Sequence, residues 1–367
     1  MSEGGLMVVA ATSRGVFTVS GDGKARAWPE LPGQVMAMAV QDERVAVAVH
    51  KHGVFLATVG ADHWTDLGDG LAHRDVRALA FDPHTPNALY AGTEPAHLLR
   101  WQDGIWAECG NVLGVPEAKR WSFPIRPGIA HVRTIAVHPL EADVVYVGIE
   151  VGSLLITRDR GQTWEEIDGL GHDIHRVVLH PEAPDRLIVT TGQDTKPYRG
   201  GKGIYRSTDR GSSWVQSNNG LGERNYTEDA IVVHPADPDV VFLAAADGIP
   251  PKWAAVRRLV MGAINGNVYF LSPSKLRRRR GADVGFFRSN DGGASWVRLN
   301  SEDDRGLFDM VWALEGELTE GGELLLYHGT TAGGLYVSED EGHTWKCLAD
   351  GLGAITHIAT PKKGTAQ

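Results

Sequence analysis

The chain has 367 residues, a formal net charge of −10 at pH 7, 45 glycines and 11 tryptophans. This length is large for one ordinary domain but suits a closed array of repeated units, and the glycines and tryptophans suit many short strands and turns. The scattered lysines and arginines argue against a nucleic-acid partner, because phosphate contact needs a concentrated basic face.

Other features of the composition bear on location. The two cysteines, Cys109 and Cys347, imply no disulfide framework. The first ten residues lack the basic region and long apolar core of a signal peptide, and no uninterrupted apolar run is long enough to span a bilayer. We therefore expect a cytoplasmic protein without a membrane partner.

The N-terminal third contains weakly repeated units. Residues 7–11, 15–19 and 25–28 predict three strands, residues 34–64 a second unit and residues 76–106 a third. The third unit opens with an apolar phrase that ends at Asp82-Pro83 and closes with a short turn before Trp106. Similar phrases end in His-Pro at His138, His180 and His234, so each unit is expected to contain four short strands.

The clearest repeat is the turn Ser/Thr-x-Asp-x-Gly-x-Ser/Thr-Trp, which begins at residues 157, 207, 289 and 338. The aspartate can accept backbone N–H groups within a hairpin, the glycine can adopt positive φ, and the tryptophan can start the next strand and bury a large apolar surface. The spacings of 50, 82 and 49 residues indicate units of about 50 residues, one of which carries an insertion at 247–283.

This turn resembles the Asp-box, or BNR, repeat of sialidase-like β-propellers, and the chain is most similar to the bacterial glycosyl-hydrolase-like proteins of unknown function in that group. The prediction is an all-β fold, one domain over residues 1–367, with seven blades of four strands. Residues 354–360 would join the N-terminal blade and close the ring; six blades is the alternative. The predicted blades are marked by Trp28, Trp64, Trp106, Trp164, Trp214, Trp296 and Trp345.

Register-equivalent residues near the starts of the innermost strands should form a ring at one mouth of the central channel. Six residues before the prolines lie Arg77, Arg133, His175 and Asp229, and a rougher alignment adds Asp309. The arginines would hold an anionic group, and Asp229 and Asp309, with His175, would supply acid/base catalysis. The alternative is a wet polar channel that binds nothing. Neighbouring candidates for ligand contact are Asp75, Glu94 and His131.

Residues 110–131 form a long connection between the third and fourth blades. Arg120 and Trp121 in this connection would cap the channel mouth, with Trp121 as a stacking platform for a sugar or planar ligand. Equally, Trp121 and Phe123 would form a structural plug. The run Arg277–Arg280 in the insertion is either a solvated loop or a site for an acidic protein partner.

We expect no metal and no cofactor. The histidines before proline are related by the symmetry of the ring, so they should lie far apart and act as turn formers. Sialidase activity is not expected, because the required arginines and Tyr–Glu pair cannot be mapped onto the sequence. The resemblance leaves two functions open: a glycosidase-like hydrolase or lyase acting on a carbohydrate or small anion, and a non-catalytic scaffold or assembly factor that binds protein.

Overall fold

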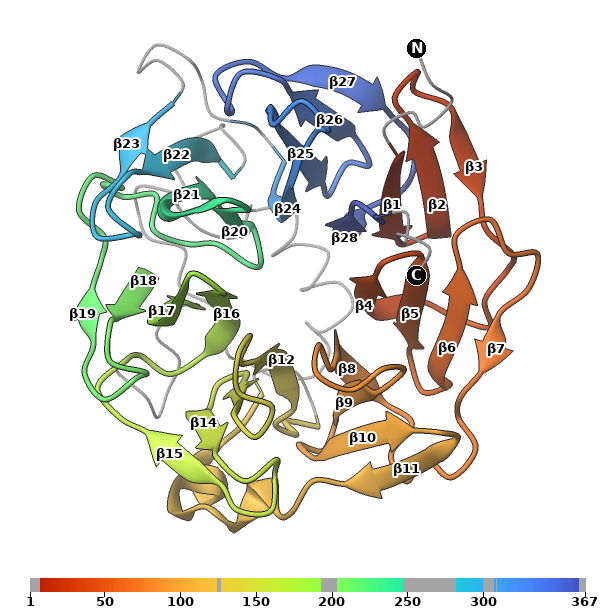
Figure 1. Ribbon diagram of the computed structural model, residues 1–367, viewed down its shortest axis with the longest axis vertical. Helices are drawn as coiled ribbons and strands as arrows, with labels where there is room; N and C mark the ends of the chain where they lie inside the picture. Colours follow the sequence, from red (N-terminus) through yellow and green to blue (C-terminus); the bar gives the residue numbers. More distant parts are fainter. Residues whose placement is uncertain are drawn as a thin grey trace.

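The computed structural model describes residues 7–123, 127–192, 203–246, 282–299, 307 and 309–362. The run Arg277–Arg280 and most of the predicted insertion lie outside this part of the chain. The predicted seven-bladed propeller is confirmed: seven four-stranded antiparallel sheets surround a central axis (Figure 1). In six blades the strands follow one another from the inside outward, and in the first blade the innermost strand comes from the C-terminal region.

The strands of the first four blades, from the inside outward, have the following bounds. Blade one contains β28 (Ile355–Ala359), β1 (Met7–Thr12), β2 (Gly15–Ser20) and β3 (Ala25–Ala27). Blade two contains β4 (Val35–Gln41), β5 (Arg44–Val49), β6 (Gly53–Thr58) and β7 (Thr65–Asp66). Blade three contains β8 (Val76–Phe81), β9 (Leu89–Thr93), β10 (Leu98–Gln102) and β11 (Ile105–Glu108). Blade four contains β12 (Val132–Val137), β13 (Val145–Ile149), β14 (Leu154–Thr157) and β15 (Glu165–Ile167).

The other three blades complete the ring. Blade five contains β16 (Ile174–His180), β17 (Ala183–Thr191), β18 (Gly203–Ser207) and β19 (Val215–Gln216). Blade six contains β20 (Ile231–His234), β21 (Asp237–Ala245), β22 (Gly285–Ser289) and β23 (Val297–Arg298). Blade seven contains β24 (Val311–Leu318), β25 (Leu324–Thr330), β26 (Leu335–Ser338) and β27 (Lys346–Ala349). Two short 3-10 helices, η1 (Val112–Gly114) and η2 (Pro116–Arg120), lie between blades three and four. No helix in the described ranges has the length and apolar character to cross a membrane.

The repeated turns have the hydrogen bonding that their residues predict. The Ser207 hydroxyl donates to Asp209 Oδ1 at 2.8 Å and accepts the Gly211 N–H at 2.8 Å, while Asp209 Oδ1 also accepts the Ser213 N–H at 2.9 Å. Gly211 has a φ of +87°, which a glycine adopts without a steric penalty. Equivalent bonds recur in the turns at Asp159, Asp291 and Asp340.

The tryptophans that follow the outer turns tie several blades to the preceding one. The indole N–H groups donate to backbone carbonyls of that blade or of the connection after it: Trp64 to Pro29 at 2.9 Å, Trp106 to Leu67 at 2.6 Å, Trp164 to Cys109 at 2.9 Å and Trp296 to Ser217 at 2.8 Å. A buried indole N–H needs such a partner. These bonds therefore fix adjacent blades to one another at the outer rim.

The residues before the prolines form turns, as predicted. His138 Nδ1 accepts the N–H groups of Leu140 and Glu141 at 3.3 and 3.1 Å. His180 and His234 accept the N–H group two residues later at 3.2 and 3.1 Å, and Asp82 does so at 2.9 Å. These side chains serve separate blades.

The ring closes where β28 pairs with β1. Ala10 pairs with Ile358 and Ala11 with His357, so a strand from the end of the described chain completes the first blade. Ile355 is fully buried between blades one and seven. A Cβ atom at Gly329 would lie 2.4 Å from Ile355 Cγ2, so this close approach of β25 to β28 requires glycine.

We predict that Ile355→Ala lowers the free energy of unfolding by about 2–5 kcal/mol, because it opens a cavity at this closure. Urea unfolding followed by tryptophan fluorescence measures the effect. Ile105→Ala is the matched control, since Ile105 is 70% exposed on β11 and should change stability by less than about 0.5 kcal/mol. Equal effects of the two substitutions would contradict the role assigned to Ile355.

Candidate functional site

A β-bulge near the start of several innermost strands determines which side chain lies at the predicted ring position. The pairing register shifts around Arg77 in β8, Arg133 in β12 and His175 in β16. These three residues therefore occupy equivalent positions, as the sequence predicted. In blade seven the same shift occurs around Trp312, and Asp309 lies three residues earlier.

The predicted register of Asp309 was therefore wrong. The alignment relied on a His-Pro or Asp-Pro end to each inner strand, and β24 instead continues to Leu318 without a proline. Asp309 lies near Tyr336. Burial raises the pKa of Tyr336, and the negative charge of Asp309 adds a small effect in the same direction.

Arg77 is enclosed by acidic groups at the start of blade three. Its Nε lies 2.9 Å from Asp75 Oδ1 and its Nη2 lies 3.0 Å from Glu94 Oε2. The side chain is 17% exposed, and His50 approaches Asp75 at 3.4 Å from blade two. Asp75, Arg77 and Glu94, all predicted site residues, thus form one ion-pair cluster.

Arg133 forms a second cluster that joins blades four and six. Its Nη2 lies 2.7 Å from Asp229 Oδ2 and 3.5 Å from Glu228 Oε2, and its Nε lies 3.1 Å from Glu150 Oε2. Burial would lower the pKa of Arg133, but Asp229, Glu150 and Glu228 raise it overall. Burial alone would raise the pKa of Glu150, whereas His131, Arg133 and His175 hold it well below its usual range.

His131 connects the two arginine clusters. The imidazole is almost fully buried, with Nδ1 3.5 Å from Glu94 Oε2 and Nε2 3.6 Å from Glu150 Oε2. The ionic groups at this mouth therefore form a continuous network from blade two to blade six.

His175 occupies the blade-five position of the network. Its Nδ1 lies 2.9 Å from the Thr227 carbonyl oxygen, and its Nε2 lies 3.6 Å from Asp173 Oδ1. Burial opposes the charged imidazolium, but Glu228, Asp173 and Glu150 raise the pKa of His175 to about 10. Burial raises the pKa of Tyr226 well above its usual value. The Glu228 carboxylate, to which the Tyr226 hydroxyl donates a hydrogen bond, raises it as well.

Two predicted residues lie apart from this network. Trp121 is only 8% exposed, packs in the core beside Val112, and donates from its indole nitrogen to Ser153 Oγ at 3.1 Å. Its geometry is that of the structural plug, one of the two alternatives from the sequence. Arg120 is 55% exposed and pairs with Glu117 at 2.8 Å, outside the ring.

Beyond the mouth, the central channel contains a cavity of about 420 Å³. Trp312, Phe81 and Met38 give it apolar walls, while Asp229 joins it to the Arg133 cluster. Its ionisable or polar lining also includes Gln41, Arg176, Glu315, Thr356 and His357. This combination of apolar surface and a few polar groups is typical of small-molecule sites.

Two ionisable groups that line the cavity, Glu315 and His357, differ from their ordinary states. Burial raises the pKa of Glu315, although Arg176 and the Gly316 N–H act against it. Burial lowers the pKa of His357 to about 4, with Asp229 acting in the opposite direction. At neutral pH the cavity therefore presents an uncharged imidazole, and burial shifts Glu315 toward its protonated form.

Glu315, Trp312, Arg176 and His357 were not predicted as site residues. Glu315 occupies an inner-strand position that is Ala80, Ala136 or Val178 in other blades, so an acid where other repeats have small apolar residues was an available signal. Finding it required the register of β24, which the sequence alignment lacked. Glu150 follows β13, a strand the ring argument did not consider.

Sequence comparisons find remote relatives, and no protein-family model matches the chain. The chain is 22% identical over 318 residues to a xyloglucanase of Paenibacillus sp., covering 83% of this chain and 28% of that protein. It is 23% identical over 207 residues to the oligoxyloglucan-reducing end-specific xyloglucanase of Emericella nidulans, covering 50% of this chain and 23% of that protein. The chain thus spans about a quarter of the length of these curated relatives.

Solved structures share the propeller fold. The GH74 xyloglucanase from Xanthomonas campestris has a TM-score of 0.64 and 15% identity, over 95% of this chain and 53% of the enzyme. The structure of YCF48 bound to a D1 peptide has a TM-score of 0.54 and 15% identity, over 87% of this chain and 84% of that chain. At such identities the likeness shows the fold alone.

We predict that Arg133→Met lowers the free energy of unfolding by about 3 kcal/mol, because it leaves Glu150, Glu228 and Asp229 without their shared cation in a mostly buried site. Arg120→Met, which removes an exposed arginine, should cost less than about 1 kcal/mol. Paired chemical denaturation curves at pH 7 measure the difference. A cost at Arg133 no larger than at Arg120 would show that the network does not depend on this guanidinium.

Proposed function

We propose that the chain binds a neutral carbohydrate in the central channel and hydrolyses a glycosidic bond there. The observation that carries the proposal is that two carboxyl groups in different electrostatic environments, Asp229 and Glu315, line one 420 Å³ cavity. Glycosidases require such a pair, one carboxyl as acid and the other as base or nucleophile.

The environments suggest which carboxyl takes each role. Asp229 accepts a 2.7 Å hydrogen bond from the Arg133 guanidinium, which holds this carboxyl group in place. Burial raises the pKa of Glu315, which favours the protonated form that a general acid needs. In this proposal Glu315 protonates the leaving oxygen, and Asp229 stabilises or attacks the sugar carbon or activates water.

The cavity walls suit a sugar. Trp312 and Phe81 offer apolar surfaces on which the C–H face of a pyranose ring can pack. Gln41, Thr356 and His357 offer hydrogen-bonding groups to hydroxyls. Trp312 takes the stacking role that the sequence had suggested for Trp121.

The charge distribution favours a neutral ligand over the small anion considered from the sequence. Arg77 and Arg133 each have at least two acidic partners within 3.5 Å. An incoming carboxylate or phosphate would have to displace those partners and face the remaining carboxylates. A neutral sugar hydroxyl is not repelled by these carboxylates.

The comparisons support the carbohydrate class. The curated relatives are xyloglucanases, and the repeated turns are in keeping with membership of the Asp-box group that we propose for the chain. Because the chain spans about half of the X. campestris enzyme, its substrate need not be that of the whole enzyme.

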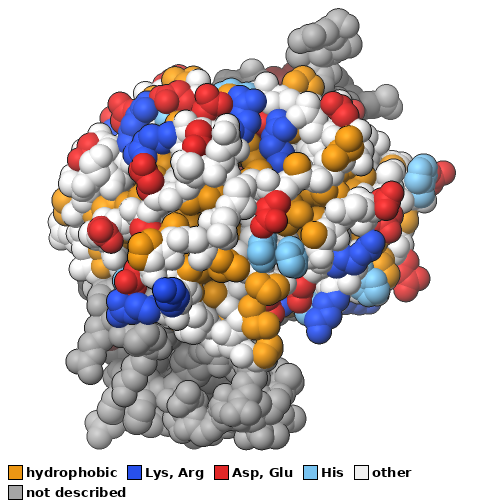
Figure 2. All heavy atoms as spheres, turned by 90° about the horizontal axis from the view of Figure 1, so that it is seen from below, with side chains coloured by type: hydrophobic (Ala, Val, Ile, Leu, Met, Phe, Trp, Pro, Cys, Tyr) orange, Lys and Arg blue, Asp and Glu red, His pale blue; other side chains and the backbone are white. Residues whose placement is uncertain are grey.

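A protein-binding scaffold is the second candidate. It is favoured by the likeness to YCF48 bound to a D1 peptide, which covers most of both chains. On the face shown in Figure 2, described acidic and basic side chains are interspersed among apolar ones, a mixed composition compatible with a protein contact. If the chain is such a scaffold, the full chain binds a protein partner and does not bind oligosaccharides. Substitutions in the cavity then leave the binding of that partner unchanged.

We predict that the chain binds xyloglucan or cello-oligosaccharides and that Trp312→Ala weakens this binding about 10-fold through loss of ring stacking. Isothermal titration calorimetry measures the affinity. Trp101→Ala, on the third strand of blade three, is the matched control and should leave binding unchanged. Failure of a panel of neutral oligosaccharides to bind the wild-type chain would contradict the carbohydrate proposal.

We predict that Glu315→Gln and Asp229→Asn each reduce hydrolysis at least about 100-fold while oligosaccharide binding persists. Reducing-end release measures the rate. Because burial raises the pKa of Glu315, the wild-type rate should fall as pH rises through that value and the acid becomes ionised. Glu317→Gln is the control, since this neighbouring glutamate in β24 is engaged by Tyr327 at 2.8 Å. Binding without any hydrolysis would reduce the function to carbohydrate recognition.

A further inference from the structure

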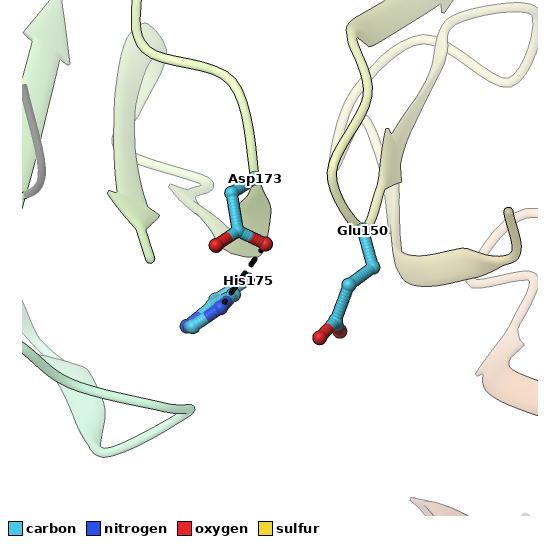
Figure 3. Close-up of side chains that lie close together, drawn as sticks. All are labelled: Glu150, Asp173 and His175. Atoms are coloured by element: carbon cyan, nitrogen blue, oxygen red, sulfur yellow. Dashed lines mark ion pairs between the residues drawn. The ribbon is translucent and has the colours of Figure 1, made fainter. Parts of the chain in front are cut away.

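Three side chains converge at the channel mouth between blades four and five. Glu150 follows β13, Asp173 precedes β16 and His175 lies within β16, and one potential ligand atom from each lies within 4.8 Å of the other two. Figure 3 shows the Asp173 carboxylate facing the His175 imidazole, with the Glu150 carboxylate to one side of this pair. One imidazole and two carboxylates are a donor set that suits zinc and related divalent ions.

The orientation of His175 is that of a metal ligand. Its Nδ1 faces the Thr227 carbonyl oxygen at 2.9 Å, which suits an N–H donor at that position. The other nitrogen, Nε2, points toward Asp173 at 3.6 Å, too far for a hydrogen bond. The side chain is 3% exposed, and its Nε2 lies within ion-pair distance of the Asp173 carboxylate. Histidine ligands of metals are commonly held in this way by a backbone carbonyl.

The carboxylates retain oxygen atoms for an ion. The contacts of Glu150 with Arg133 at 3.1 Å and His131 at 3.6 Å both involve Oε2, so neither of them occupies Oε1. Ligand atoms of a zinc ion with bonds of about 2.0–2.2 Å lie roughly 3–4 Å apart. A closure of the three side chains by under about 1 Å therefore reaches coordination distance.

Gly192 lets the side chains of Asp173 and His175 pack closely against the backbone. A Cβ atom at Gly192 would lie 2.1 Å from Asp173 Oδ2 and 2.6 Å from His175 Nε2. Any larger residue would therefore displace both side chains. Arg133 on one side and Glu228 and Asp229 beyond it keep the surroundings acidic overall, so a divalent cation is electrostatically favoured.

We propose that Glu150, Asp173 and His175 bind one divalent transition-metal ion, with zinc as the best match, and that this ion joins blade four to blade five. Solvent in the channel supplies the remaining ligand. This inference goes beyond the proposed carbohydrate chemistry, because none of the three residues lines the cavity that contains Glu315. The expectation of no metal from the sequence considered only the histidines before proline.

The test uses the untagged full-length chain, stripped with EDTA and dialysed. We predict that it binds one equivalent of Zn²⁺ by calorimetry and elemental analysis and that Zn²⁺ raises its Tm by a few degrees. Asp173→Asn and His175→Gln should weaken zinc binding at least 10-fold. His63→Gln is the matched control, because His63 and Asp62 form an exposed pair of similar chemistry at 2.6 Å.

X-ray absorption of the zinc-loaded wild-type chain provides a measurement that does not depend on variants. It should show nitrogen and oxygen ligands with a single imidazole. The proposal is overturned if zinc and manganese do not bind, if more than one imidazole is found, or if His63→Gln removes the ion while Asp173→Asn and His175→Gln retain it. In the first case the cluster is an ion-pair network around a protonated His175.

Discussion

The pairing of β28 with β1 is the interaction on which the rest of the structure depends. It brings a strand from the end of the described chain into the first blade, so the seven sheets form a closed circle with few free edges. Closure fixes the relative rotation of all blades about one axis. Only in that arrangement do the starts of β8, β12 and β16 face a common channel, where residues more than fifty positions apart, such as Arg77 and Arg133, belong to one network.

The channel mouth and the channel interior differ in character. At the mouth, acids and bases form ion pairs such as that of Arg133 with Asp229, and the region is acidic overall because its carboxylates outnumber its arginines. Deeper in the channel, Glu315 and His357 lack such strong counter-ions, and burial favours their neutral forms. Asp229 belongs to both regions. The molecule thus combines a fixed ionic rim with an interior in which protonation can change.

The fold was largely predictable because its signals are local. The repeated turns, the tryptophans after them and the apolar phrases each report on a few adjacent residues, and together they define blades. Arg77, Arg133, His175 and Asp229 were placed in one ring because their strands end alike. Trp312 and Glu315 were missed because β24 lacks that ending, and a shift of register changes which side chains face the channel. The pairing of Trp121 with Ser153, like the convergence of Glu150 on His175, depends on contacts between strands that no local pattern contains.

The channel wall is assembled from one inner strand per blade, and this arrangement bears on how the chemistry of the channel can change during evolution. Trp312 and Glu315 come from β24, His357 from β28 and Arg176 from β16, each anchored by its own sheet. Replacing one of these side chains leaves the hydrogen-bonded ladders of the other six sheets intact. Such a wall behaves as a set of independently exchangeable positions, so the chemistry of the channel can change one blade at a time on an unchanged scaffold.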